Sequence, residues 1–398
     1  MSDKEDVSDK ALSTRLIHHA YEPPAGFMAP QPGVFKASTV IFKDVAAMRA
    51  RDWRSKAGYT YGLHGTPTTF MLEERMATVE GGRHALLVPS GLASIALVNQ
   101  ALLSQGDEVL LPDNVYGPSL ALARGELARW GIAHRVYDPL DLDATVALMG
   151  ARTKLLWIEA PGSVTMEFPP LAALATAARA RGVTVAMDDT WGSGIAFKPF
   201  ELGADVVIQA MTKYPSGGGD VLMGAIVTRD DALHERLKLS HMRLGLGVAG
   251  NDAEAVLRAL PSLALRYQAQ AASGLQLAQW LAARSEVAQV LHPALPGSPG
   301  HGHWREHCSV AAGLFSVLFH ARYTAAQVDA FVEGLKLFRI GYSWAGSTSL
   351  VVPYNLALIR DARQRERLDG HLVRLSIGLE AAEDLRADLA QALSHLRA

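Results

Sequence analysis

The sequence has only one cysteine, Cys308, among its 398 residues. A single cysteine excludes an internal disulfide framework and fits a reducing compartment. An excess of charge of one sign is also missing, because 38 Lys and Arg residues stand against 40 Asp and Glu residues. This balance lacks the electrostatic footprint of a nucleic-acid-binding protein. We therefore expect no nucleic-acid partner, and a chain of this length needs no structural metal to bury a large core.

Long hydrophobic runs are missing as well. The longest apolar stretch, residues 85–103, is interrupted by the tripeptide 89–91 and by Asn99 and Gln100. The first ten residues alternate acidic and basic side chains and contain no apolar segment of a signal peptide. These absences predict a cytoplasmic protein without a membrane span.

Three regions of the chain differ in pattern. Residues 1–65 carry clustered prolines and predict an arm with little regular structure. Residues 66–259 alternate short apolar runs with amphipathic ones, which predicts a mostly parallel α/β sheet covered on both faces. Residues 260–398 begin at Leu260-Pro261 with a long helical stretch and predict a smaller α+β domain with two strands and a C-terminal helix. The strands expected in the middle region are 85–88, 108–111, 155–158, 183–187, 206–210 and 222–227, with helices at 92–103 and 170–181.

Lys213 follows one of the apolar strands and precedes a loop with three consecutive glycines. Ligands of open α/β sheets bind beyond the carboxyl ends of the strands. A lysine desolvated there has a lowered pKa and becomes a nucleophilic amine. Taken alone, the motif more often describes a lysine that simply reaches solvent.

Two further motifs stand at strand ends. Asp188 directly follows an apolar strand, where it could bind a metal, a ribose or a protonated ring nitrogen, or simply cap a helix. The segment 89–94 joins a strand to a helix through small residues, so its backbone N–H groups can meet an anion. It lacks the three spaced glycines of a dinucleotide fingerprint and the lysine of a Walker loop.

Together the three motifs match one cofactor. Pyridoxal 5′-phosphate (PLP) needs a lysine for its Schiff base, a carboxylate for its ring nitrogen and a cup for its phosphate. We therefore expect PLP bound through Lys213, with Asp188 at the ring nitrogen.

The chain resembles the Cys/Met-metabolism PLP-dependent enzymes of fold type I, most closely their bacterial cystathionine β-lyase branch. The resemblance implies a fold type I, transferase-like architecture with a mostly parallel seven-stranded sheet and a smaller C-terminal domain. Matching stretches cover most of the chain, and the string 342–344 is the most informative because γ-acting relatives usually differ there. The matching residues are 61–62 with 65–66, 80–82, 114 with 116, 118–119, 161–167, 188 with 190–191, 209–210 with 212–214, 292–298, 342–344 and 374–375 with 377–380.

The resemblance also implies residue roles. Lys213 would carry PLP and act as the general base, and Tyr116 would stack on the ring. The backbone amides of Gly91 and Leu92 and the hydroxyl of Thr212 would hold the phosphate. The remaining implied roles are Tyr61 at the phosphate of a neighbouring subunit, Arg374 on the substrate α-carboxylate, and Ser343 and Trp344 lining the substrate end of the pocket. Tyr61 makes at least a dimer necessary, and the family implies a homotetramer built as a dimer of active dimers.

Four positions depart from the family pattern. Leu63 replaces a usual arginine, so a phosphate contact across the subunit interface is lost or is partly made by His64. Asp189 stands where asparagine is common, Gly218 replaces a frequent histidine, and Thr348 stands where related lyases often have glutamate.

A histidine-rich segment offers a competing interpretation. His301, His303, His307 and Cys308 fall within eight residues and could ligate zinc. Because glycines bound this stretch and the family has a metal-free loop there, we expect a loop and no metal.

The resemblance implies a PLP-dependent carbon–sulfur β-lyase that converts L-cystathionine to homocysteine, pyruvate and ammonia in methionine biosynthesis. A γ-acting member, such as cystathionine γ-lyase, methionine γ-lyase or a homoserine sulfhydrylase, is the nearest alternative. Alternatives from other classes are a PLP-free Schiff-base lyase or aldolase and a non-catalytic PLP-binding protein.

Overall fold

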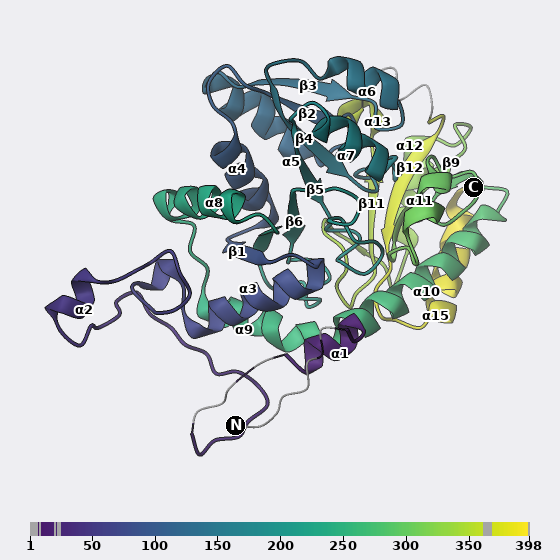
Figure 1. The fold of residues 1–398 in the computed structure, drawn as a ribbon. Coiled ribbons are helices and arrows are strands. Elements are labelled where there is room, and N and C mark those ends of the chain that lie inside the picture. The colour runs from purple at the N-terminus through teal and green to yellow at the C-terminus, as the bar shows by residue number, and fades with distance from the viewer. Residues whose placement is uncertain (1–6, 8, 20, 22–24, 361–367, 397–398) are drawn as a thin grey trace.

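A seven-stranded sheet forms the centre of the protein. The computed structural model describes residues 7, 9–19, 21, 25–360 and 368–396. The strands run in the order β1-β7-β6-β5-β4-β2-β3, and only β7 is antiparallel to its neighbours. The predicted mostly parallel seven-stranded sheet is therefore confirmed (Figure 1). Its strands are β1 (His84–Val88), β2 (Glu108–Pro112), β3 (Ala133–Tyr137), β4 (Thr153–Glu159), β5 (Thr184–Asp188), β6 (Val206–Ala210) and β7 (Gly224–Thr228).

Helices cover both faces of this sheet, which explains why the middle positions of its inner strands are mostly apolar. In β5, Val185 and Met187 join one hydrophobic cluster, whereas Ala186 between them joins the cluster on the opposite face. The first face is covered by α3 (Pro67–Glu80), α7 (Leu171–Arg179) and α9 (Gly250–Ala259). The second is covered by α4 (Gly91–Leu102) and α8 (Asp231–Leu244). The remaining helices of this region are α5 (Gly117–Leu122) and α6 (Leu142–Leu148).

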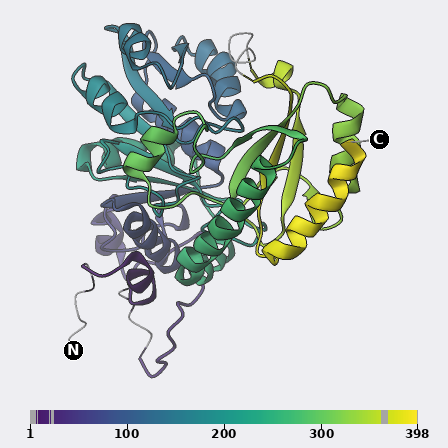
Figure 2. The same ribbon diagram turned by 90° about the vertical axis from the view of Figure 1, so that its right-hand side faces the viewer.

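A second, five-stranded sheet forms the smaller C-terminal part, with the order β10-β11-β12-β9-β8. Only two strands were expected here, so that prediction was too low. The strands are β8 (Val287–Leu291), β9 (Leu314–Phe319), β10 (Arg339–Ile340), β11 (Leu350–Tyr354) and β12 (His371–Ser376). Figure 2 shows α10 (Leu263–Ala282) and α15 (Ala382–Ala392) side by side along this sheet, and the region also contains α12 (Ala325–Gly334) and α13 (Leu356–Ile359).

Helix α10 joins the two sheets. Its first half contributes Leu263 and Tyr267 to the core under the large sheet, and its second half contributes Leu277 and Leu281 to the core of the small one. The two cores are thus bridged by one continuous element. The division at residues 65 and 259 that the sequence suggests stays a prediction.

The N-terminal region contains short helices, α1 (Leu12–Ile17) and α2 (Val45–Arg49), and a bridge between Thr39 and Tyr61. The segment with α2 projects from the body of the protein (Figure 1). Several apolar side chains in this arm face solvent in the single chain, with 91% exposure for Ile41, 84% for Met28 and 67% for Phe27.

The histidine-rich segment was wrongly expected to be a loop. It forms the short helix α11 (His301–His307), which begins after Gly300 in a left-handed conformation (φ 80°). His301 Nδ1 lies 2.8 Å from the carbonyl oxygen of Pro293. In the parts of the chain that the structure describes, no group of three or more His, Cys, Asp or Glu side chains is arranged to hold a metal.

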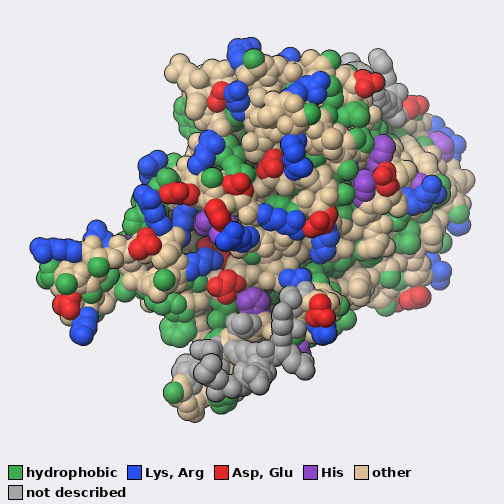
Figure 3. Space-filling view, in the orientation of Figure 1, with side chains coloured by type: hydrophobic (Ala, Val, Ile, Leu, Met, Phe, Trp, Pro, Cys, Tyr) green, Lys and Arg blue, Asp and Glu red, His purple; other side chains and the backbone are tan. Residues whose placement is uncertain are grey.

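Charges of both signs are interspersed on the face of the molecule shown in Figure 3. Within the described ranges, the structure has no helix with both the length and the apolar character needed to cross a membrane. The cytoplasmic location stays a prediction.

Candidate active site

Lys213 lies three residues beyond β6, where its backbone N–H bonds the carbonyl oxygen of Ala210 at 3.0 Å. Its Nζ donates a hydrogen bond to Ser343 Oγ at 2.5 Å and lies 5.4 Å from the ring centroid of Trp344. Burial lowers the pKa of Lys213 to about 8, and the positive charge of Arg374 acts in the same direction. A sizeable fraction of this amine is therefore neutral and nucleophilic near neutral pH.

Asp188 is the last residue of β5, the strand next to β6. Its Oδ1 accepts a hydrogen bond from the backbone N–H of Thr190 at 2.9 Å. Burial raises the pKa of Asp188, whereas the hydrogen bonds from Thr190 and the charge of Lys213 oppose that rise. Thr190 Oγ1 in turn accepts from the N–H of Ala210 at 2.9 Å, which ties the ends of the two strands together. The predicted acid and the predicted amine are thus held on adjoining strand ends, within electrostatic range of each other.

The predicted phosphate cup lies at the N-terminus of α4. Ser90 caps this helix, with its Oγ accepting from the N–H of Ala93 at 3.0 Å. A Cβ atom on Gly91 would lie only 2.5 Å from the Cβ of Ala210, so glycine is required for this approach of helix to strand. The N–H groups of the first helical turn, including those of Gly91 and Leu92, have no partner within the helix. Thr212, half-buried, follows β6 by two residues.

Tyr116 precedes α5, and its backbone N–H donates to Glu159 Oε2 at 2.7 Å. Burial and the charges of Asp188 and Glu159 raise the pKa of the Tyr116 hydroxyl, so the phenol is protonated at neutral pH. Glu159 ends β4 and pairs in register with Asp188. The sequence analysis did not identify Glu159, although an acid directly after the apolar run 155–158 was the available signal.

Arg374 comes from the other sheet, on β12. Its Nη2 donates to the carbonyl oxygen of Ser343 at 3.1 Å, and its Cζ lies 5.4 Å from the ring centroid of Tyr354. The sequence analysis did not predict Tyr354. Strand β11 pairs with β12 so that Val352 lies opposite Arg374, and this register places Tyr354 diagonally across from the arginine. A buried guanidinium in this place can bind a carboxylate with a planar fork of donors.

Ser343 and Trp344 lie on the loop between β10 and β11. Ser343 has a left-handed backbone with φ of 83°, and Ala345 has φ of 66°. Such conformations are uncommon for residues other than glycine and persist where the surroundings determine them. Trp344 packs edge-on against Tyr214, with the ring centroids 5.7 Å apart. This loop therefore brings the small sheet to the strand ends of the large one, at Lys213.

These residues fit PLP. Lys213, with its lowered pKa, matches the aldehyde of PLP, and the buried carboxylate of Asp188 matches the ring nitrogen. The N-terminus of α4, which approaches β6 closely because residue 91 is glycine, matches the phosphate. The individual roles assigned from the sequence stay predictions.

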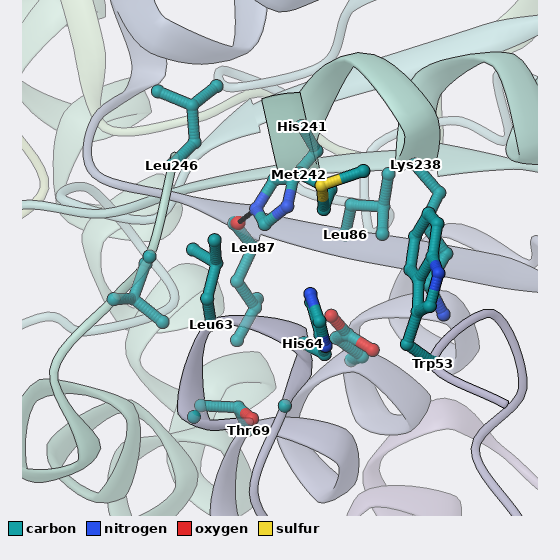
Figure 4. Close-up of a pocket in the computed structure, with 15 residues that line it drawn as sticks. Trp53, Leu63, His64, Thr69, Leu86, Leu87, Lys238, His241, Met242 and Leu246 are labelled. Carbon is teal, nitrogen blue, oxygen red and sulfur yellow. Dashed lines mark hydrogen bonds between the residues drawn. The ribbon is translucent and has the colours of Figure 1, made fainter. Parts of the chain in front are cut away.

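Tyr61, Leu63 and His64 belong to the arm. Tyr61 pairs with Thr39 and is exposed in the single chain, and its contact with the phosphate of a neighbouring subunit stays a prediction. Leu63 and His64 line a small hollow of about 30 Å³ (Figure 4), in which Leu63 lies beside Leu87. His64 Nδ1 lies 2.8 Å from Thr60 Oγ1, and burial lowers the pKa of its imidazole. A largely neutral His64 is a weak substitute for the missing arginine.

Two of the other departures lie on the surface. Gly218 is exposed, and a Cβ there would meet only the movable carboxylate of Asp220. Thr348 is also exposed, four residues beyond Trp344.

Comparison with known proteins supports these observations. The sequence profile described as "Cys/Met metabolism PLP-dependent enzyme" matches residues 13–394. The cystathionine β-lyase of Bordetella avium is 38% identical over 395 residues, which is 98% of each chain. The L-methionine γ-lyase of Pseudomonas putida is 33% identical, over 96% of this chain and 97% of its own. A crystal structure of metB from Corynebacterium glutamicum superposes with a TM-score of 0.89 at 29% identity, over 98% of this chain and all of the other.

Proposed function

Because this chain belongs to the Cys/Met-metabolism PLP-dependent enzymes, we propose that it cleaves the Cβ–S bond of L-cystathionine to give homocysteine, pyruvate and ammonia. The observation that carries the proposal is the loop 342–344, whose Ser343 and Trp344 contact Lys213. The string Tyr-Ser-Trp is typical of the β-acting branch. The PLP-free alternative is set aside, since the family depends on this cofactor.

In the proposed reaction Arg374 binds the α-carboxylate of the substrate through its guanidinium, and its charge keeps the Lys213 amine partly neutral. Lys213 Nζ then takes the proton from the substrate Cα, while Ser343 Oγ orients that nitrogen. When bound, PLP supplies the ring that accepts the electron pair left on Cα.

Asp188 would hold the ring nitrogen of the cofactor in its protonated form, and Tyr116 would bind the ring. As the Cβ–S bond breaks, Lys213 Nζ returns its proton to the departing sulfur. Water converts the remaining three-carbon fragment to pyruvate and ammonia, so the atoms of cystathionine are fully accounted for.

The test is the identity of the oxo acid formed from L-cystathionine by the purified, cofactor-loaded protein. Pyruvate together with homocysteine is expected. Formation of 2-oxobutyrate and cysteine would instead show γ-elimination. This reaction is the second candidate function, and the similarity to an L-methionine γ-lyase supports it. The Lys213→Ala variant is the control for turnover without the enzyme's own amine.

We also propose that the arm packs on a second copy of the chain and that the assembly is a homotetramer. The exposed apolar side chains of the arm, Ile41, Met28 and Phe27, support this proposal. Light scattering of the wild type and of Ile41→Asp tests it, and a monomeric wild type would contradict it.

A further inference from the structure

Two carboxyl groups meet inside the protein, on the face of the large sheet opposite Asp188. Glu80, the last residue of α3, and Asp189, the first residue after β5, are both fully buried. Successive side chains of a strand point to opposite faces, so Asp188 and Asp189 point away from each other. Asp189 thus joins the same side of β5 as Met187 and lies in the layer of α3.

The hydrogen bonds of this pair are incomplete in a specific way. Glu80 Oε1 accepts from Gln209 Nε2 at 2.6 Å, and Asp189 Oδ2 accepts from the N–H of Gly194 at 2.7 Å. The other oxygen of each group, Glu80 Oε2 and Asp189 Oδ1, is buried and has no donor among the described residues. The two carboxyl groups act on each other's pKa, so they lie close together. Because ionised carboxylates only accept, a proton on one of the two groups would give the pair the donor that it lacks.

We propose that Glu80 and Asp189 share a single proton, and that this proton holds the end of β5 in the position that presents Asp188 to the cofactor. The inference rests on the proposed role of Asp188 at the ring nitrogen. Asp189 is then a positioning residue that acts through its neighbour in the chain.

The connections of the pair explain how it would position β5. Through Gln209 it reaches β6, and through Gly194 it reaches the turn after β5, where Ser193 and Gly194 have left-handed φ values of 53° and 62°. Asparagine, common at position 189 in the resembled family, would donate an amide hydrogen to Glu80 permanently. Aspartate replaces that fixed hydrogen with one that can dissociate.

The surrounding charges favour one proton rather than two or none. Lys198 faces the pair, bonds the carbonyl oxygen of Gly194, and its positive charge lowers the pKa of both acids, whereas the charge of Asp188 raises them. Arg15 lies near Lys198. Tyr267 from α10 and Cys308 after α11 also face Asp189, and its charge raises their own pKa values further, in addition to their burial. A singly ionised pair and a charged Lys198 balance each other, whereas loss of the proton leaves a buried excess negative charge.

Burial raises the pKa of Asp189 to about 7 and that of Glu80 well above its usual range. Between about pH 4 and pH 7 the folded protein therefore keeps a proton that the unfolded chain has released. The free energy of unfolding must fall as the pH rises through this window and then level off. Asp189→Asn removes the titrating group, so this fall should be weaker in the variant.

Infrared spectroscopy of the full-length, cofactor-loaded protein tests the shared proton directly. At pH 6 the spectrum of the wild type minus that of Asp189→Asn, and the spectrum of the wild type minus that of Glu80→Gln, should each show a carboxylic C=O band that shifts in D₂O. Subtraction removes the contribution of the buried Glu159, whose pKa is also raised. This readout needs no substrate, so it stands even if the enzyme forms 2-oxobutyrate instead of pyruvate. Absence of this band from both difference spectra would overturn the proposal. If Asp189→Asn does not fold, Glu80→Gln alone decides.

Two pH series test the positioning role. The melting temperature of Asp189→Asn minus that of the wild type should grow from pH 5 to pH 8, and PLP release during dialysis should accelerate above pH 7 only in the wild type. Asp143→Asn, on the exposed face of α6, is the matched control: its difference in melting temperature from the wild type should stay constant with pH, and its PLP release should accelerate above pH 7 as in the wild type. A constant difference in melting temperature, or equal acceleration of PLP release in both proteins, would show that Asp189 is merely structural.

Discussion

Replacing Arg374 with lysine tests the proposed carboxylate site while keeping the positive charge. The guanidinium donates to the carbonyl oxygen of Ser343 at 3.1 Å and lies 5.4 Å from the centroid of the Tyr354 ring. A lysine keeps the charge that lowers the pKa of Lys213, but it has no planar fork of donors. The variant should therefore retain PLP and bind the substrate more weakly.

The size of the effect follows from the loss of one charge-assisted hydrogen bond. Such a bond contributes about 1.5–3 kcal/mol. At about 1.4 kcal/mol per factor of ten, KM for cystathionine should rise roughly 10- to 150-fold. The value of kcat should change less, because Lys213 and its pKa are left in place.

The assay is steady-state formation of the oxo acid, with the PLP content measured by absorbance in each preparation. Arg386→Lys, on the exposed side of α15, is the control and should leave KM unchanged. An unchanged KM in Arg374→Lys, together with a lower melting temperature, would refute the reasoning. Arg374 would then serve to hold the Ser343 loop rather than the substrate.

Three further predictions concern the cofactor. Lys213→Ala should lose the visible absorbance of bound PLP and all turnover together, whereas a protein-bound absorbance that survives would identify another lysine as the anchor. The rate at which PLP recombines with the apoprotein should rise with pH and level off above about 8, since the neutral Lys213 amine becomes dominant there, and a rate independent of pH would contradict the lowered pKa. Leu63→Arg should slow PLP release during dialysis by supplying charge that the largely neutral His64 does not, and release as fast as in the wild type would show that another cation already serves the phosphate.

The sequence predicted the large sheet well because burial on both faces leaves runs of apolar residues. Strand β3 escaped this reasoning, since it lies at the edge of the sheet and contains His134 and Arg135. The short strand β10 has both of its residues exposed and carries no periodic signal. The helix at 301–307 was missed because the flanking glycines favoured a loop.

The site was predictable where a motif lies at the end of one strand, as for Lys213 and Asp188. Contacts that depend on how separate strands align were not predictable, such as Tyr354 beside Arg374. The pairing of Glu80 with Asp189 likewise requires the end of α3 to meet the end of β5. No local pattern in the sequence specifies that meeting.

The origin of the active-site residues in two separate sheets has an evolutionary consequence. Residues predicted to hold the cofactor come from the large sheet, whereas Ser343, Trp344 and Arg374, predicted to face the substrate, come from the small one. Mutations in the second set leave the strand ends predicted to retain PLP in place, and they reach that part through the contacts of Ser343 and Arg374 with Lys213. A lineage can then change its substrate or the bond it breaks while the cofactor chemistry is inherited intact, and relatives with different named reactions are the expected product of such descent.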